Sequence, residues 1–141
     1  MHSFITAENN FIKKNTDTKS ILYVEDDRSS QLLMQHLLRN KYNVDYASTG
    51  QEGLQKAIQK KYDLILMDIK LEQGKTGVDL THDLRSMPQY QKTPIIAITA
   101  YAMPGDDEYF KSEGCTDYIP KPLEFNTLFT KLKKLLPESK S

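Results

Sequence analysis

The sequence predicts an α/β fold: one domain built on a doubly wound parallel β-sheet. The first observation is that five short segments rich in Val, Ile and Tyr alternate with five segments of helical periodicity, roughly 20 to 25 residues apart. The second is that several strand-like segments are almost continuously apolar, as parallel strands covered by helices on both faces are. The third is the length of 141 residues, which suits a single domain with a sizeable core.

The expected strands are short and are bounded by charged or turn residues. In chain order they span residues 20–26, 42–47, 62–68, 93–99 and 116–121. The first, third and fourth are nearly all apolar and are expected at the centre of the sheet, whereas "YNVDYA" alternates and is expected at an edge. A flavodoxin-like (βα)5 arrangement with strand order 2-1-3-4-5 fits this pattern.

Start and stop signals mark most of the helices. They are expected over residues 31–40, 48–61, 76–87, 103–114 and 122–136. The second opens with Thr49 and Glu52 at the spacing of a capping box. The fourth has acidic residues at 106–108 in its first turn and Gly114 just past its end, while Pro122 suits the N1 position of the last.

Composition excludes several classes of function. Basic and acidic residues both number 19, so no overall basic field exists to hold nucleic acid or an anionic membrane. Cys115 is the single cysteine, which rules out an internal disulfide, and we expect it to be a small buried residue in a protein of the reducing cytoplasm. Residues 1–18 are expected to form a flexible leader, 19–137 the domain and 138–141 a tail.

Polar residues stand at the carboxyl end of each expected central strand. In a doubly wound sheet these ends meet at one edge, where ligands bind near the point at which strand order reverses. The residues are Glu25, Asp26 and Asp27 after the first strand, Asp68 after the third, Thr99 after the fourth and Lys121 after the fifth.

The carboxylates of this group require a cation. Asp27 has two open interpretations: it could belong to this group of carboxylates, or it could be the N-cap of the next helix. Two carboxylates converging at about 4 Å repel each other by about 4 kcal/mol at an effective dielectric constant of 20. Oxygen ligands without histidine or thiol favour Mg²⁺ or Mn²⁺, and a shallow site with room for phosphate suits Mg²⁺. Asp68 is then placed to attack a phosphoryl group, with Lys121 and the Thr99 hydroxyl on the transferring oxygens.

These segments resemble the receiver domain of response regulators in two-component systems. "ILYVEDD" resembles the first strand of the family with its acidic pair, and "LILMDIKLEQGKTGVDL" the phosphoacceptor strand and its loop. "PIIAITAYAM" resembles the strand that carries the Thr/Ser, and "GCTDYIPKPL" the Lys-Pro strand end. The resemblance extends over about residues 19–136. It is greatest to stand-alone receivers and to receivers of hybrid histidine kinases.

The resemblance implies a role for each site residue. Asp68 is the phosphoacceptor and Glu25 and Asp26 are the acidic pair. Mg²⁺ is bound by Asp26, Asp68 and the main-chain carbonyl of Lys70, while Glu25 acts mainly through water. Lys121 contacts the phosphoryl group.

The resemblance also implies how the signal leaves the site. Thr99 and Tyr118 match the switch pair, in which the hydroxyl moves onto the phosphoryl group and the ring turns inward. Output then uses the face formed by the fourth helix, the fifth strand and the fifth helix. The Lys121–Pro122 bond is expected to be cis. Partners are a histidine kinase or histidine phosphotransfer protein and a downstream protein, with a homodimer also possible; the domain signals rather than acting as an enzyme.

Departures from the family concern the loop after Asp68 and the lifetime of the phosphoryl group. The loop "IKLEQGKT" lacks the usual proline and length. Lys70 and Tyr101 occupy positions that control the access of water in the family, and two bulky side chains there suggest slow self-dephosphorylation.

Three other functions compete with that of a phosphorylated receiver. A haloacid-dehalogenase-type phosphatase needs a second Asp where this chain has Lys70, and a flavodoxin needs a phosphate loop where it has "EDDRSS". A degenerate receiver that only binds partners stays open, although no required residue is missing.

Overall fold

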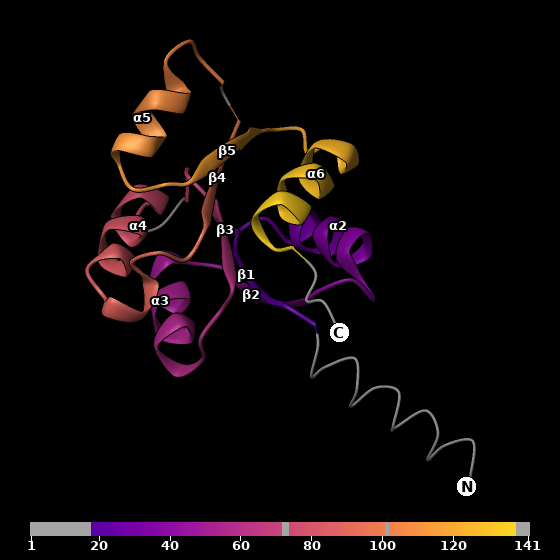
Figure 1. Ribbon diagram of the computed structural model, residues 1–141, viewed down its shortest axis with the longest axis horizontal. Helices are drawn as coiled ribbons and strands as arrows, with labels where there is room; N and C mark the ends of the chain where they lie inside the picture. Colours follow the sequence, from indigo (N-terminus) through magenta and orange to yellow (C-terminus); the bar gives the residue numbers. More distant parts are fainter. Residues whose placement is uncertain (1–17, 72–73, 101, 138–141) are drawn as a thin grey trace, which may run out of the picture.

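The computed structural model describes residues 18–71, 74–100 and 102–137. Its centre is a five-stranded parallel sheet in the order β2-β1-β3-β4-β5, with helices on both faces (Figure 1). The flavodoxin-like fold and the strand order predicted from the sequence are therefore confirmed. None of the helices in the described part of the chain is long and apolar enough to span a membrane.

Strands and helices alternate along the whole of the described chain. The strands are β1 Ser20–Val24, β2 Asn43–Ala47, β3 Leu64–Asp68, β4 Ile95–Thr99 and β5 Asp117–Pro120. The helices are α2 Arg28–Leu38, α3 Gly50–Gln59, α4 Gly77–Arg85, α5 Asp106–Ser112 and α6 Phe125–Leu135, with a 3₁₀ turn at Pro88–Tyr90.

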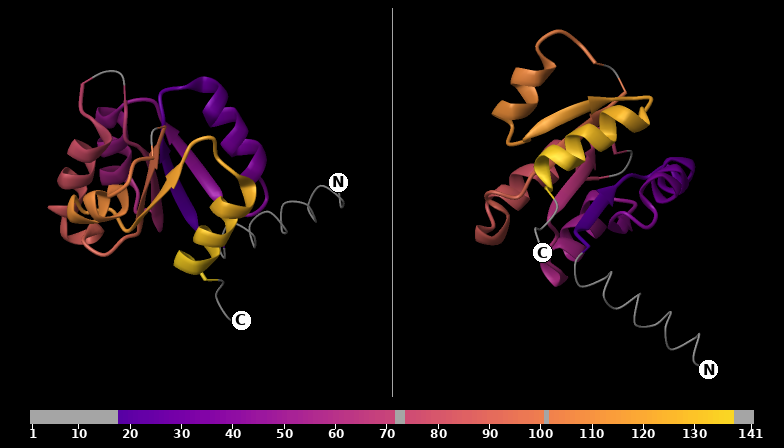
Figure 2. Two further views of the ribbon diagram at one scale, coloured as in Figure 1. Left: turned by 90° about the horizontal axis from the view of Figure 1, so that it is seen from above. Right: turned by 45° about the vertical axis from the view of Figure 1, so that its right-hand side comes forward.

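The sheet separates two apolar layers. Helices α3, α4 and α5 cover one face, and α2 and α6 cover the other (Figures 1 and 2). Successive residues of a strand point to opposite faces. Leu22 and Val24 of β1 therefore enter the first apolar layer, under α3, α4 and α5, while Ile21 and Tyr23 enter the second apolar layer, under α2 and α6. Burial on both faces explains why β1, β3 and β4 read as continuous apolar runs.

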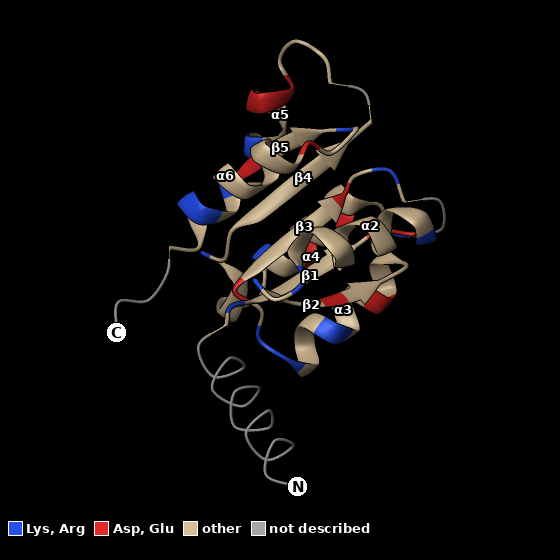
Figure 3. Ribbon diagram, turned by 90° about the vertical axis from the view of Figure 1, so that its right-hand side faces the viewer, with Lys and Arg blue, Asp and Glu red and all other residues tan. Residues whose placement is uncertain are grey.

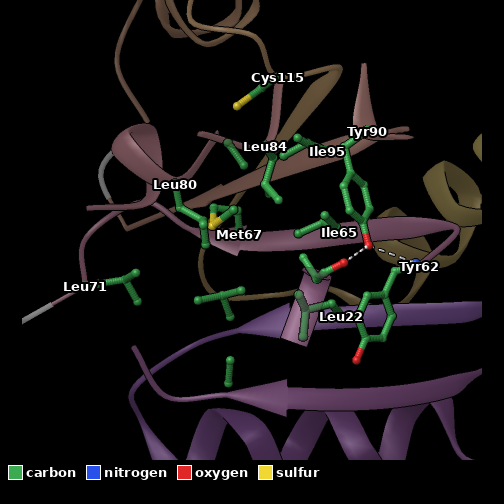
Figure 4. Packing of buried hydrophobic residues seen from close by; sticks show 14 of the residues in the cluster. Leu22, Tyr62, Ile65, Met67, Leu71, Leu80, Leu84, Tyr90, Ile95 and Cys115 are labelled. Atoms are coloured by element: carbon green, nitrogen blue, oxygen red, sulfur yellow. Dashed lines mark hydrogen bonds between the residues drawn. The ribbon is translucent and has the colours of Figure 1, made fainter. Parts of the chain in front are cut away.

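The layer under α3 and α4 contains a hydrogen-bonded tyrosine among apolar side chains. Met67 of β3 packs with Leu80 and Leu84 of α4, and Figure 4 shows these side chains close together. At the other end of the same layer the Tyr90 hydroxyl accepts a hydrogen bond from the Tyr62 backbone N–H at 3.2 Å (Figure 4). Cys115 is buried in this layer, as predicted.

The helix ends agree with the sequence at α3 and differ at α6. Thr49 caps α3 by accepting from the Glu52 N–H at 3.0 Å. Helix α6 begins at Phe125 with Glu124 as its N-cap, so the assignment of Pro122 to N1 was wrong. Leu123 packs on the second apolar layer before the helix begins, which leaves Pro122 in the preceding loop.

Candidate functional site

Four strands bring the predicted site residues to one edge of the sheet. Residues Val24 and Met67 are partners across β1 and β3, and Thr99 pairs with Pro120 across β4 and β5. Glu25, Asp68 and Lys121, which directly follow Val24, Met67 and Pro120, are consequently neighbours at the carboxyl ends of the strands. Figure 3 shows acidic segments gathered there, near α2.

Three carboxylates form a compact acidic cluster at this edge. Glu25, Asp26 and Asp68 each offer an oxygen that lies within 4.8 Å of the others. Glu25 is 1% exposed and Asp68 is 4% exposed, while Asp26 is half-buried. Hard oxygen donors at this spacing fit Mg²⁺, which usually keeps several water or phosphate ligands beside a few protein carboxylates.

Glu25 is held by donors on both carboxylate oxygens. The Lys121 ammonium donates to Oε1 at 2.9 Å, and the Tyr23 hydroxyl donates to the same oxygen at 3.1 Å. The Asp27 backbone N–H donates to Oε2 at 3.2 Å. Burial raises the pKa of Glu25, but hydrogen bonds with Asp68 and Lys121 outweigh it and the pKa is lowered overall.

Asp68 lies in a less favourable position for a charge. Its Oδ1 accepts from the Lys70 N–H at 3.2 Å, and the Lys121 Nζ is 3.8 Å from Oδ2. Burial, hydrogen bonding to Glu25 and the charge of Glu25 together raise the pKa of Asp68 from 3.8 to about 7. Two buried carboxylates that share one lysine leave a deficit of positive charge at the edge of the sheet.

Lys121 extends from the end of β5 across the site. Its backbone N–H donates to the Thr99 carbonyl at 2.7 Å, which fixes the residue beside β4. Burial lowers the pKa of the ammonium, but Glu25 and Asp68 outweigh this effect and the pKa is raised. The Lys121–Pro122 peptide bond is cis, as the resemblance implied.

Thr99 and Tyr118 lie on one face of the sheet. Tyr118 pairs with Ala97 across β4 and β5, and Thr99 is two residues beyond Ala97, so its side chain points the same way. The Tyr118 ring is partly buried on the first apolar layer, with its centroid 5.9 Å from that of Phe110. Tyr101, which was also expected near the site, lies outside the described residues.

Contacts near the acidic cluster include one that the sequence left open, at Asp27, and three that sequence patterns did not identify, at Gln31, Gly77 and Tyr23. Asp27 caps α2 by accepting from the Ser30 N–H at 2.9 Å, so its interpretation as the N-cap of this helix is confirmed. The Gln31 side chain, 5% exposed, donates to the Glu25 carbonyl at 2.5 Å. A Cβ at Gly77 would collide with the Asp68 carbonyl, so the loop after β3 must return to the strand through a glycine. The spacing of Tyr23 two residues before Glu25 was an available signal, because such residues share a face.

Fold and site define a doubly wound α/β protein with an acidic cluster, suited to a cation, at the carboxyl ends of its strands. The family model of the response regulator receiver domain matches residues 21–133. The chain belongs to this family, as the sequence motifs implied, and is a receiver domain of two-component signalling.

Individual relatives cover nearly the whole domain. The polar-differentiation response regulator DivK of Brucella ovis is 34% identical over 123 residues, which are 86% of this chain and 99% of DivK. The chemotaxis protein CheY4 of Vibrio cholerae has a TM-score of 0.78 and 30% identity, covering 84% of this chain and 99% of CheY4. The receiver domain of the sensor histidine kinase PA1611 from Pseudomonas aeruginosa has a TM-score of 0.76 and 33% identity, over 84% of this chain and 97% of its own. Its crystal structure contains a magnesium ion coordinated in the active site cleft.

Proposed function

We propose that this receiver accepts a phosphoryl group on Asp68 from a histidine kinase or a histidine phosphotransfer protein. The observation that carries the proposal is the surroundings of Asp68. The carboxyl is buried at the end of β3, shares an acidic cluster with Glu25 and Asp26, and lies 3.8 Å from the Lys121 ammonium. A carboxylate with so little compensation for its charge is suited to receive a dianionic group together with a metal ion.

The transfer follows from the atoms at the site. An oxygen of the Asp68 carboxylate attacks the phosphorus of a phosphohistidine, and the bond from phosphorus to the imidazole nitrogen breaks. The imidazole leaves with the electron pair, and the product is an acyl phosphate on Asp68. Lys121 and the Thr99 hydroxyl offset charge on the phosphoryl oxygens.

Mg²⁺ would be held by Asp26, Asp68 and the main-chain carbonyl of Lys70, with Glu25 acting through water. The acidic cluster supports this assignment because its oxygens lie within 4.8 Å of one another. When bound, the ion supplies the positive charge that favours ionised Asp68 and offsets the charge of the phosphoryl oxygens.

Thr99 and Tyr118 would transmit the change to a downstream protein. Helix α5, strand β5 and helix α6 correspond to the fourth helix, fifth strand and fifth helix of the receiver, and they form the proposed output face. The shared direction of the Thr99 and Tyr118 side chains supports a joint movement. Tyr118 also contacts Phe110 of α5, which gives the movement a route to that helix.

The proposed receiver unit covers residues 19–137, between a leader and a short tail, and works in the cytoplasm. The family match over residues 21–133 supports these bounds. A magnesium-dependent aspartyl phosphatase is disfavoured because Lys70 stands where a second Asp is needed. A receiver that only binds partners is the remaining alternative.

Intact mass after incubation with Mg²⁺ and acetyl phosphate tests the proposal. The wild type should gain one phosphoryl group, with acetate as the leaving group, and Asp68→Asn should gain none. Asp63→Asn is the matched control, because Asp63 lies before β3 and accepts from the Ser20 N–H far from the site. An unmodified wild type, or modification of Asp68→Asn, would overturn the proposal in favour of a partner-binding role.

A further inference from the structure

A buried tyrosine lies directly beneath the acidic cluster. Tyr23 is 0% exposed in β1, and its ring meets Tyr46 edge to face at 6.2 Å between centroids. Because Glu25 directly follows β1 and is two residues after Tyr23, the two side chains point to the same side of the sheet. The Tyr23 hydroxyl donates to Glu25 Oε1 at 3.1 Å.

Glu25 Oε1 therefore has two donors of different character. The Tyr23 hydroxyl is fixed, because its ring is packed on all sides in the second apolar layer. The Lys121 ammonium, 2.9 Å away, ends a long side chain that is 27% exposed. Only the lysine is able to leave Glu25 without disturbing the core.

Phosphorylation of Asp68 changes the demand on Lys121. The ammonium is 2.9 Å from Glu25 but 3.8 Å from Asp68 in this structure, so a shift of the ammonium toward a phosphoryl group on Asp68 would lengthen and weaken its contact with Glu25. Glu25 is 1% exposed, and a buried carboxylate that loses a charged donor is destabilised. The hydroxyl beneath it remains in place.

We propose that Tyr23 is a positioning residue that holds Glu25 when Lys121 moves to the phosphoryl group. The role rests on the proposed phosphorylation of Asp68. This role belongs to the phosphorylated state. Of the two side chains that donate to Glu25 Oε1 in this structure, Tyr23 and Lys121, only Tyr23 then remains in contact. With Mg²⁺ alone, Lys121 stays on Glu25 and the tyrosine contributes little.

Equilibrium binding of beryllofluoride, a mimic of the phosphoryl group, tests this role in the full chain. Tyr23→Phe removes one oxygen and keeps the ring. We expect it to weaken beryllofluoride binding in saturating Mg²⁺, measured by ¹⁹F NMR, about ten-fold. Affinity for Mg²⁺ alone should change less than about two-fold, and thermal unfolding of the metal-free protein shows that both proteins are folded at the temperature used.

Two further variants separate positioning from packing. Tyr46→Phe removes a hydroxyl from the ring that contacts Tyr23, but from a different strand, and should bind beryllofluoride as the wild type does. In a Glu25→Gln background, Tyr23→Phe should have less than about a two-fold effect, because it acts through the carboxylate.

The outcomes distinguish this inference from the proposed function. A wild type that binds no beryllofluoride and takes no phosphoryl group overturns both. A wild type that binds while Tyr23→Phe binds equally well overturns only the role of Tyr23. The same holds if Mg²⁺ and beryllofluoride affinities fall by the same factor, or if the ten-fold loss persists in Glu25→Gln.

Discussion

The carboxyl ends and the amino ends of the strands use polar groups in opposite ways. These two sides of the sheet are called the carboxyl edge and the amino edge below. At the carboxyl edge, Glu25 and Asp68 are like charges that share Lys121, and the pKa of Asp68 is raised to about 7 as a result of burial and of Glu25. At the amino edge, a buried tyrosine and a partly buried arginine form hydrogen bonds with backbone groups. The polar groups of the carboxyl edge are suited to bind a ligand, while those of the amino edge connect helices to the segments that precede the strands.

Tyr90 and Arg85 illustrate the amino edge. The Tyr90 hydroxyl lies 2.8 Å from both the Ala57 and Lys60 carbonyls at the end of α3, and it accepts from the Tyr62 N–H. Arg85, at the end of α4, donates to the carbonyls of three residues in the connections before β4 and β5. These residues are Tyr90 at 2.6 Å, Thr93 at 2.7 Å and Gly114 at 2.9 Å.

The contrast shows that the polar groups of this domain are divided between stability and function. Satisfied hydrogen bonds at the amino edge stabilise the fold. Repulsion at the carboxyl edge opposes folding of the metal-free protein and is relieved by a cation. Removing a polar group should therefore change stability in opposite directions at the two edges.

Tyr90→Phe should have the largest effect on stability. The variant keeps the ring but leaves two carbonyls and one N–H without this partner in a buried place. We expect the free energy of unfolding to fall by about 2 to 3 kcal/mol in urea denaturation. Tyr109→Phe, at a ring that is 50% exposed, is the matched control and should change it by less than about 0.5 kcal/mol. Equal stabilities of the two variants would contradict the role given to the amino edge.

Asp68→Asn should raise the stability of the metal-free protein by about 1 to 2 kcal/mol at pH 8, because the cost of burying the new amide offsets part of the gain from removing the ionisation of Asp68. The folded state raises the pKa of Asp68 from 3.8 to about 7, so the folded protein binds this proton more tightly than the unfolded chain. Ionisation of Asp68 therefore opposes folding. Its cost is absent below pH 3.8, grows as pH rises to about 7 and is constant above.

Urea denaturation across this pH range measures the difference between Asp68→Asn and the wild type. The gain should be largest above pH 7 and shrink toward pH 4. Saturating Mg²⁺ should stabilise the wild type more than the variant, because the variant lacks one ligand. A variant less stable than the wild type at pH 8 without metal would remove the contrast between the two edges.

Most of the fold could be predicted because its signals are local. Apolar runs gave the central strands, and the alternation in "YNVDYA" placed β2 at an edge. The carboxyl-edge residues Asp68, Thr99 and Lys121 were also predictable, since the ends of parallel strands meet without any knowledge of side-chain contacts.

Contacts between distant segments could not be predicted in this way. Tyr90 bonds to carbonyls 30 and 33 residues away, and Arg85 to one 29 residues away, so only the packed structure brings them together. The collision that requires Gly77 depends on the path of the loop back to Asp68. Tyr23 was recognisable as a strand residue, but its bond to Glu25 follows from burial that a pattern does not measure.

Lys70→Ala should have the smallest effect, and it acts on lifetime rather than on stability. Lys70 is exposed beside the acidic cluster, where its backbone N–H donates to Asp68. We expect a long side chain at this place to obstruct the approach of water to an acyl phosphate, so its truncation should shorten the half-life of phosphorylated protein about three-fold, roughly 0.7 kcal/mol in the barrier to hydrolysis. Intact mass followed over time after removal of acetyl phosphate measures this, with Lys92→Ala, an exposed lysine before β4, as the control. An unchanged half-life would place control of hydrolysis elsewhere, and a half-life of seconds in the wild type would contradict slow self-dephosphorylation altogether.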